Sequence, residues 1–109
     1  MLFLLTETAV AETPAMHVRN ALMLLTLLRD MHPVLVPLYP ELTQAERRAE
    51  AALVMIEHGA PARLSSLHVA KALRALLATD LDWEVITEIP TACTRLFRAL
   101  FALWTEVGP

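Results

Sequence analysis

The four histidines are the side chains in this sequence best suited to hold a metal ion or to transfer a proton. They are His17, His32, His58 and His68. Metal-binding pairs on a helix are three or four residues apart and are completed by cysteines or carboxylates. No two of these histidines have that spacing, and no such ligand joins them in a motif. We therefore predict surface or helix-capping histidines and no metal site, with His58 at a helix C-terminus, where the helix dipole favours it.

Four carboxylates lie close together before the last predicted helix: Asp80, Asp82, Glu84 and Glu88. The alternation of the first three is similar to the start of a calcium-binding loop. Such a loop needs glycine at its sixth position and a bidentate glutamate at its twelfth. Here Val85 and Thr91 occupy these positions. The cluster is therefore interpreted as a solvated loop.

The single cysteine, Cys93, is expected to be a buried thiol and not a nucleophile. It lies on the apolar side of a predicted helix, with no histidine or lysine within one helical turn. A reactive thiolate needs such a neighbour, although Arg95 and the helix N-terminus favour the charged form somewhat. Gly59 and Gly108 are the only glycines, so the sequence has no loop that could cradle a phosphate. We predict no catalytic residues and no cofactor, and expect a protein that is not an enzyme.

The composition indicates more apolar surface than so short a chain can bury. The sequence has 109 residues, of which 56% are hydrophobic and 19% charged. A domain of this size buries only about two-thirds of its unfolded surface. Part of the surplus should therefore lie against a second copy or another protein. We expect one helical domain over residues 1–109, in which residues 1–12 form either an arm or a helix.

The longest apolar stretch is too interrupted to span a membrane. A spanning helix needs about 20 predominantly apolar residues. The stretch that starts at Ala21 is broken by Arg29, Asp30 and Pro33, and the N-terminal apolar segment 1–5 is too short and lacks the basic residues of a signal peptide. One cysteine cannot form an internal disulfide. We therefore predict no membrane span and a cytoplasmic protein of a bacterial or viral-host cell.

The fold class predicted from the apolar periodicity is all-α, a small bundle of four main helices. The first helix should start at Thr13-Pro14, where threonine caps and proline suits the first turn, and end near Met31 before Pro33. Its apolar arc is so wide that we expect the central helix of the bundle or a helix at a dimer seam. A proline-rich extended connector over 33–41 should follow it.

The second helix is predicted from a capping box. Thr43 and Glu46 have the spacing at which each side chain accepts a hydrogen bond from the backbone of the other. Small residues then recur on one face, so this helix should pack closely, and it should end at Gly59 before Pro61. The stripe consists of Ala45, Ala49, Ala52, Leu53 and Ile56.

The third helix should start at Ser65 or Ser66 and end near Thr79-Asp80. Its predicted apolar face consists of Leu67, Ala70, Leu73, Leu76 and Leu77, and the opposite side carries His68, Lys71 and Arg74. The segment 80–89 fits either an extra short helix or an irregular connection, because its apolar residues also alternate. The fourth helix should run from about Thr91 to Val107, with Pro90 at or just before its first turn.

Two of these helices carry the residues that we expect at a protein interface. The first helix contributes two leucines from its wide apolar arc, and the fourth has an apolar face rich in aromatic residues. The candidate interface residues are Leu24, Leu28, Phe97, Phe101 and Trp104.

A second hypothesis concerns DNA. From Leu42 to Leu77 the sequence resembles, in rhythm, the helix-turn-helix core of MarR-like repressors: a helix, a turn with glycine, and a helix with basic residues. This resemblance implies nucleic-acid contacts by Arg63, Lys71 and Arg74. However, the net charge is −3, and the stretch after this core is acidic and lacks glycine where such proteins have a basic wing. Nucleic acid is therefore not the expected partner.

The sequence thus predicts a small helical protein without enzymatic activity. We expect it to form a homodimer or small oligomer and to bind another protein as an adaptor, inhibitor or assembly factor. The alternatives are the DNA-binding regulator and a carrier of an apolar small ligand, which would need a cavity between the leucines of the first helix and the aromatic residues of the fourth.

Overall fold

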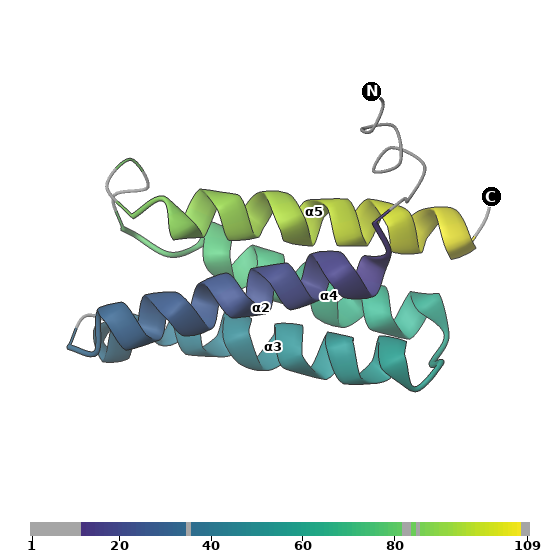
Figure 1. The fold of residues 1–109 in the computed structure, drawn as a ribbon, viewed down its shortest axis with the longest axis horizontal. Coiled ribbons are helices and arrows are strands. Elements are labelled where there is room, and N and C mark those ends of the chain that lie inside the picture. The colour runs from purple at the N-terminus through teal and green to yellow at the C-terminus, as the bar shows by residue number, and fades with distance from the viewer. Residues whose placement is uncertain (1–11, 35, 82–83, 85, 108–109) are drawn as a thin grey trace, which may run out of the picture.

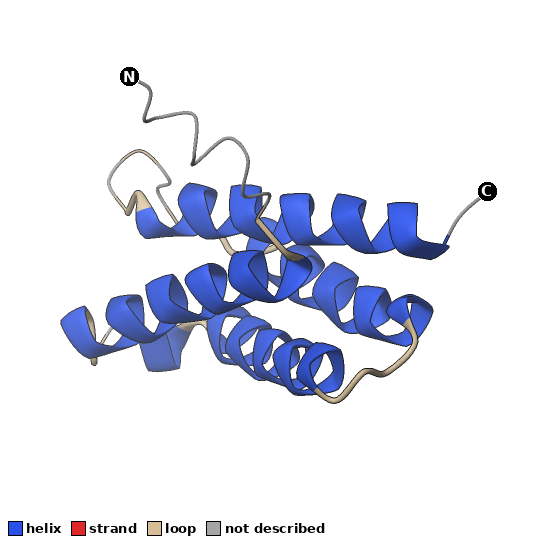
Figure 2. Cartoon of the chain, turned by 45° about the vertical axis from the view of Figure 1, so that its right-hand side comes forward, coloured by secondary structure: helices blue, strands red, loops and turns tan. Residues whose placement is uncertain are grey.

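The protein is an all-α bundle, as the sequence predicts. The computed structural model describes residues 12–34, 36–81, 84 and 86–107, so the predicted arm or helix over residues 1–12 lies outside the described residues except for Glu12. Within this part of the chain there are helices and no strands (Figure 2). The elements are α2 (Pro14–Met31), a 3-10 turn η1 (Val36–Leu38), α3 (Pro40–Glu57), α4 (Ala62–Leu77) and α5 (Glu88–Val107).

Successive helices run in opposite directions along the molecule, and each packs against the next (Figure 1). α2 also packs against α5, so the four helices enclose one apolar core. The core is built largely from alanine, leucine and valine, and several alanines are completely inaccessible to solvent. Small side chains let helix axes approach closely, which leaves little room in the core for large side chains. Several large apolar residues therefore lie on the outside of the bundle.

The boundaries of α2 confirm the prediction. Thr13 is the N-cap, and its hydroxyl oxygen accepts a hydrogen bond of 3.2 Å from the amide of Met16. The helix ends with His32 as C-cap, directly before Pro33. The interpretation of α2 as a central helix is wrong, because it buries only one face; Met23 and Leu27 on the opposite face are 61% and 46% exposed.

The start of α3 differs from the prediction. The helix begins three residues earlier, at Pro40, with Tyr39 as N-cap and no capping side chain. The capping box is therefore wrong: Thr43 lies inside the helix. Proline has the backbone angle of a first helical residue, which favours the earlier start. The predicted extended connector is correspondingly shorter and contains η1.

The end of α3 agrees with the prediction. Gly59 has a φ of +76°, the left-handed conformation that glycine adopts without strain. The amide of Ala60 donates to the carbonyl of Met55 at 2.9 Å and so satisfies one terminal carbonyl of the helix. In the predicted stripe, Ala45, Ala49 and Ala52 are fully inaccessible, and Leu53 and Ile56 are partly buried against the core.

α4 starts earlier and buries a different face than predicted. It begins at Ala62, so Ser65 and Ser66 lie within the helix and are buried instead of capping it. Its core residues are Ser65, Ser66, Val69, Ala72 and Leu76. Leu67 and Leu77, which we expected in the core, are 51% and 57% exposed. Leu76 is buried as predicted, and Ala70 and Leu73 are partly buried against the core.

The connection from α4 to α5 is irregular where the structure describes it, and it contains no separate short helix in residues 80, 81, 84, 86 and 87. Asp82, Trp83 and Val85 lie outside the described residues. α5 starts at Glu88, slightly earlier than predicted, and holds Pro90 in its first turn.

The charged residues of the long apolar stretch join α2 to α3. Nη1 of Arg29 donates to Oε2 of Glu46 at 2.6 Å, and the hydroxyl of Thr26 donates to the same oxygen at 3.3 Å. Arg19 pairs with Glu57 at the other end of the two helices. None of the described helices has the length and apolarity to cross a membrane.

Candidate functional surfaces

The outer face of α5 carries an aromatic stripe, defined here as Phe97, Phe101 and Trp104. These side chains are 58%, 61% and 55% exposed. Their spacing of four and three residues places them on one side of the helix. Leu96, Leu100 and Leu103, next to them in sequence, are buried in the core. The single apolar face predicted for this helix is therefore divided into a buried half and an exposed aromatic half.

The two leucines predicted for the same interface do not lie on this surface. Leu28 is 1% exposed and belongs to the core of the bundle, so it is not a surface residue. Leu24 is partly buried against the core. The apolar arc of α2 was too wide for the sequence to separate its inner leucines from its outer residues. The exposed large apolar side chains of this helix are Met16, Met23, Leu27 and Met31.

A groove lies between α3 and α4 and has a volume of about 340 Å³. We call it the basic groove because its lining includes three cationic side chains, Arg48 from α3 and Lys71 and Arg74 from α4. The other lining residues are Glu41, Gln44, Ala75 and Ala78. Of the three nucleic-acid contacts implied by the helix-turn-helix resemblance, two therefore line the groove. Arg63, at the start of α4, is not part of its lining.

Arg48 was not a predicted contact residue, although it lies in the same groove. Its Nη1 lies 3.4 Å from Nδ1 of His68 on α4. An arginine cannot accept a hydrogen bond, so the imidazole nitrogen is the acceptor in this contact. The contact directs Arg48 toward α4, a position that depends on how the two helices pack and that sequence spacing alone does not reveal.

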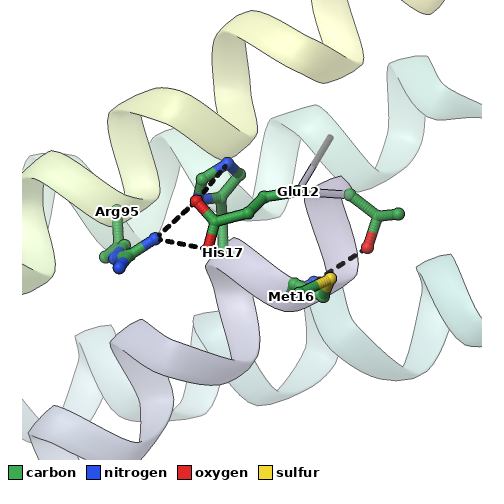
Figure 3. A network of polar contacts seen from close by, with 5 residues as sticks. Glu12, Met16, His17 and Arg95 are labelled. Carbon is green, nitrogen blue, oxygen red and sulfur yellow. Dashed lines mark hydrogen bonds and ion pairs between the residues drawn. The ribbon is translucent and has the colours of Figure 1, made fainter. Parts of the chain in front are cut away.

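His17 forms a polar network between α2, α5 and the residue before the Thr13 cap. Arg95 donates from Nη1 to both carboxylate oxygens of Glu12 at 3.0 Å. Figure 3 shows the Glu12 carboxylate between Arg95 and His17, whose Nε2 lies 3.9 Å from Oε1. Burial lowers the pKa of His17; Glu12 opposes this shift, and Arg95 and Arg98 add to it.

The prediction of a surface or cap position for His17 is wrong, because the residue is buried. The burial of His17 could have been predicted from the spacing of apolar residues in the sequence. His17, Ala21 and Leu28 recur at helical spacing, so the histidine lies on the face that packs into the bundle.

Side chains that could bind a metal ion do not gather in the part of the chain that the structure describes. The described residues include no group of three histidine, cysteine or acidic side chains that could hold a metal ion. The thiol of Cys93 is buried, as predicted, and burial raises its pKa to about 11. At neutral pH this thiol is protonated and a poor nucleophile. Of the leucines of the first helix and the aromatic residues of the fourth, which a carrier cavity would need, Leu28 is buried in the core and Phe101 is exposed.

Comparisons of the chain with family models, with curated proteins and with solved structures find no match. Function therefore has to be argued from the aromatic stripe and the basic groove.

Proposed function

We propose that this protein works by binding proteins: it forms a homodimer through α5 and acts as an adaptor, inhibitor or assembly factor for another protein. The observation that supports this is the aromatic stripe. Three large aromatic side chains, each more than half exposed, lie along one side of a single helix. Aromatic residues are enriched at the buried centres of protein interfaces and supply much of their binding energy.

A two-fold dimer is the simplest arrangement that covers the stripe. In such a dimer the same surface patch of both protomers meets at the axis, so one uncharged stripe would pack against its copy. The exposed parts of the three rings amount to roughly 350 Å² per protomer, from the usual area of aromatic side chains. A stable interface buries about 800 Å² per partner. The contact should therefore extend beyond the stripe onto exposed residues beside it.

The test is the molecular mass in solution. We expect light scattering at micromolar concentration to give at least a dimer for the wild-type protein. Phe101→Glu places a charge in the middle of the stripe and should raise the dimer dissociation constant at least tenfold, because an unpaired charge is costly to bury. The matched control is Val54→Glu, since Val54 is a half-exposed apolar residue on α3.

The proposal fails if the wild-type protein stays monomeric over a hundredfold range of dilution. It also fails if Val54→Glu weakens the dimer as much as Phe101→Glu does, because α5 would then have no special role. Circular dichroism checks that both variants keep their helix content.

The cytoplasmic location remains part of this proposal and rests on the single cysteine, which leaves no internal disulfide to form. A pull-down from the native host, analysed by mass spectrometry, would search for the second protein. Wild-type protein and the Phe101→Glu variant as baits would separate partners that need the stripe from partners that do not.

A further inference from the structure

The three cations of the basic groove form no ion pair with a described carboxylate, whereas three arginines elsewhere on the bundle do. Arg19, Arg29 and Arg95 each form an ion pair with a glutamate. Among the described residues, Arg48, Lys71 and Arg74 have no carboxylate within 4.0 Å; Arg48 contacts only His68. Arg47, Arg63 and Arg98 also form no ion pair with a described carboxylate. What distinguishes Arg48, Lys71 and Arg74 is that all three line one groove.

The groove is positively charged although the protein is acidic. Three cations and one carboxylate, that of Glu41, line it. α4 contains basic residues and not a single aspartate or glutamate in its sequence. The whole chain, by contrast, has 12 acidic and 9 basic residues. The groove therefore carries the opposite sign of charge to the chain as a whole, and long-range attraction would direct an anionic ligand to it.

Apolar side chains lie beside the cations on the same helix. Leu67 is one turn before Lys71 and two turns before Arg74, and Leu64 is two turns before Lys71, so all four residues share one face of α4. Leu64 and Leu67 are about half exposed. Ala75 and Ala78 line the groove with small side chains. A ligand on this surface would meet positive charge and apolar surface together.

We infer that the basic groove binds an acidic amphipathic helix of a partner protein. In such a helix, carboxylates would pair with Lys71, Arg74 and Arg48, and leucine-like residues would cover Leu64 and Leu67. The groove follows two helical turns of α3 and of α4, which corresponds to a length of about 10 Å along a helix. Carboxylates one or two turns apart on the ligand match that length. The exposed leucines favour a protein ligand over nucleic acid, whose backbone offers them no apolar contact.

This inference rests on the proposed function in that it names the chemistry of the second partner. The probe is a fluorescein-labelled peptide of about 18 residues, about five helical turns, with leucines on one face and glutamates elsewhere. Its counterpart has lysine in place of every glutamate. We expect fluorescence anisotropy to detect binding of the glutamate peptide and much weaker binding of the lysine peptide.

The decisive variant is Lys71→Glu/Arg74→Glu. It should weaken binding of the glutamate peptide at least tenfold and strengthen binding of the lysine peptide, because the charge of the groove changes from positive to negative. The matched control is Arg47→Glu/Arg98→Glu, which makes the same change in net charge at exposed sites outside the groove. This control should bind the glutamate peptide within about twofold of wild type. Lys71→Gln/Arg74→Gln replaces the first variant if charge reversal prevents folding.

Three results would overturn the inference. The glutamate peptide could fail to bind, the control could lose as much affinity as the groove variant, or the lysine peptide could bind wild type equally well. Duplex DNA and vesicles of phosphatidylserine and phosphatidylcholine are tested in parallel. If DNA or vesicles bind through Lys71 and Arg74 while the peptide does not, the ligand of the groove is a nucleic acid or a membrane surface.

The peptide-binding test and the dimer test can fail independently of each other. Lys71→Glu/Arg74→Glu should keep the molecular mass of wild type, since its substitutions lie on the side of α4 that faces the groove. Phe101→Glu should keep peptide binding. Loss of peptide binding with an intact dimer, or loss of the dimer with intact peptide binding, therefore identifies which surface has been misassigned.

Discussion

Nδ1 of His17 lies 3.4 Å from Nη1 of Arg95, although 78 residues separate them in the chain. The guanidinium can only donate, so the imidazole nitrogen facing it must accept the hydrogen bond. Both nitrogens of a protonated histidine carry a hydrogen, so a ring nitrogen can accept only when the ring is neutral. The other ring nitrogen faces Glu12 at 3.9 Å. The contact between the first and last described helices therefore favours a neutral histidine.

The first prediction is that acid destabilises the fold through His17. Its folded pKa is lowered by burial, so at a pH below about 6.5 the unfolded chain binds a proton that the folded chain does not. Stability should be unaffected by His17 above that pH. It should then fall by at most about 1.4 kcal/mol per pH unit, the limit for one proton, until the folded pKa is passed.

The measurement is urea unfolding of wild type and His17→Gln between pH 7.5 and 5. The free energy of unfolding of wild type should decrease relative to that of the variant as the pH falls, because glutamine does not titrate. Parallel curves for the two proteins over this range would show that His17 is not held neutral in the fold.

The second prediction concerns Ser65, whose hydroxyl is buried and has no hydrogen-bond partner among the described residues. Ser65→Ala removes an unsatisfied polar group and improves helix propensity, so it should stabilise the protein by about 0.5–2 kcal/mol. Ser66 is the matched control, because it is also buried but its hydroxyl donates to the carbonyl of Arg63 at 2.8 Å. Thermal melts in which Ser65→Ala lowers stability more than Ser66→Ala would mean that the Ser65 hydroxyl has a partner in solution.

The third prediction compares two threonines near helix starts. Thr13→Ala removes the cap of α2 and should cost about 0.5–2 kcal/mol. Thr43→Ala changes an exposed position inside α3 and should be neutral or stabilising by a few tenths of a kcal/mol, because alanine has the higher helix propensity. Chemical unfolding followed by circular dichroism measures both. If Thr43→Ala proved the more costly change, α3 would begin at the capping box after all.

Local rules of the sequence were sufficient for the ends of two helices. Thr13, Pro14 and Pro33 bound α2 because capping and proline geometry act over a few residues. The same holds for Gly59, whose positive φ ends α3. Where two local signals indicated different starts for one helix, the sequence did not show which start the chain adopts. Pro40 and Thr43 could both start α3, and the choice of Pro40 depends on packing of the turn before it.

Which residues form the aromatic stripe and the basic groove depended on tertiary structure. The sequence placed Phe97, Phe101 and Trp104 on one apolar arc with Leu96 and Leu100, and only the positions of α2 and α4 around α5 determine which half is covered. Likewise, α3 must lie beside α4 before Arg48 joins Lys71 and Arg74 in one groove. Periodicity gives the angle of a residue around its own helix, whereas burial and shared sites depend on where the neighbouring helices are. The sequence by itself therefore determined the helical class, both ends of α2 and the end of α3, and tertiary packing decided which residues meet.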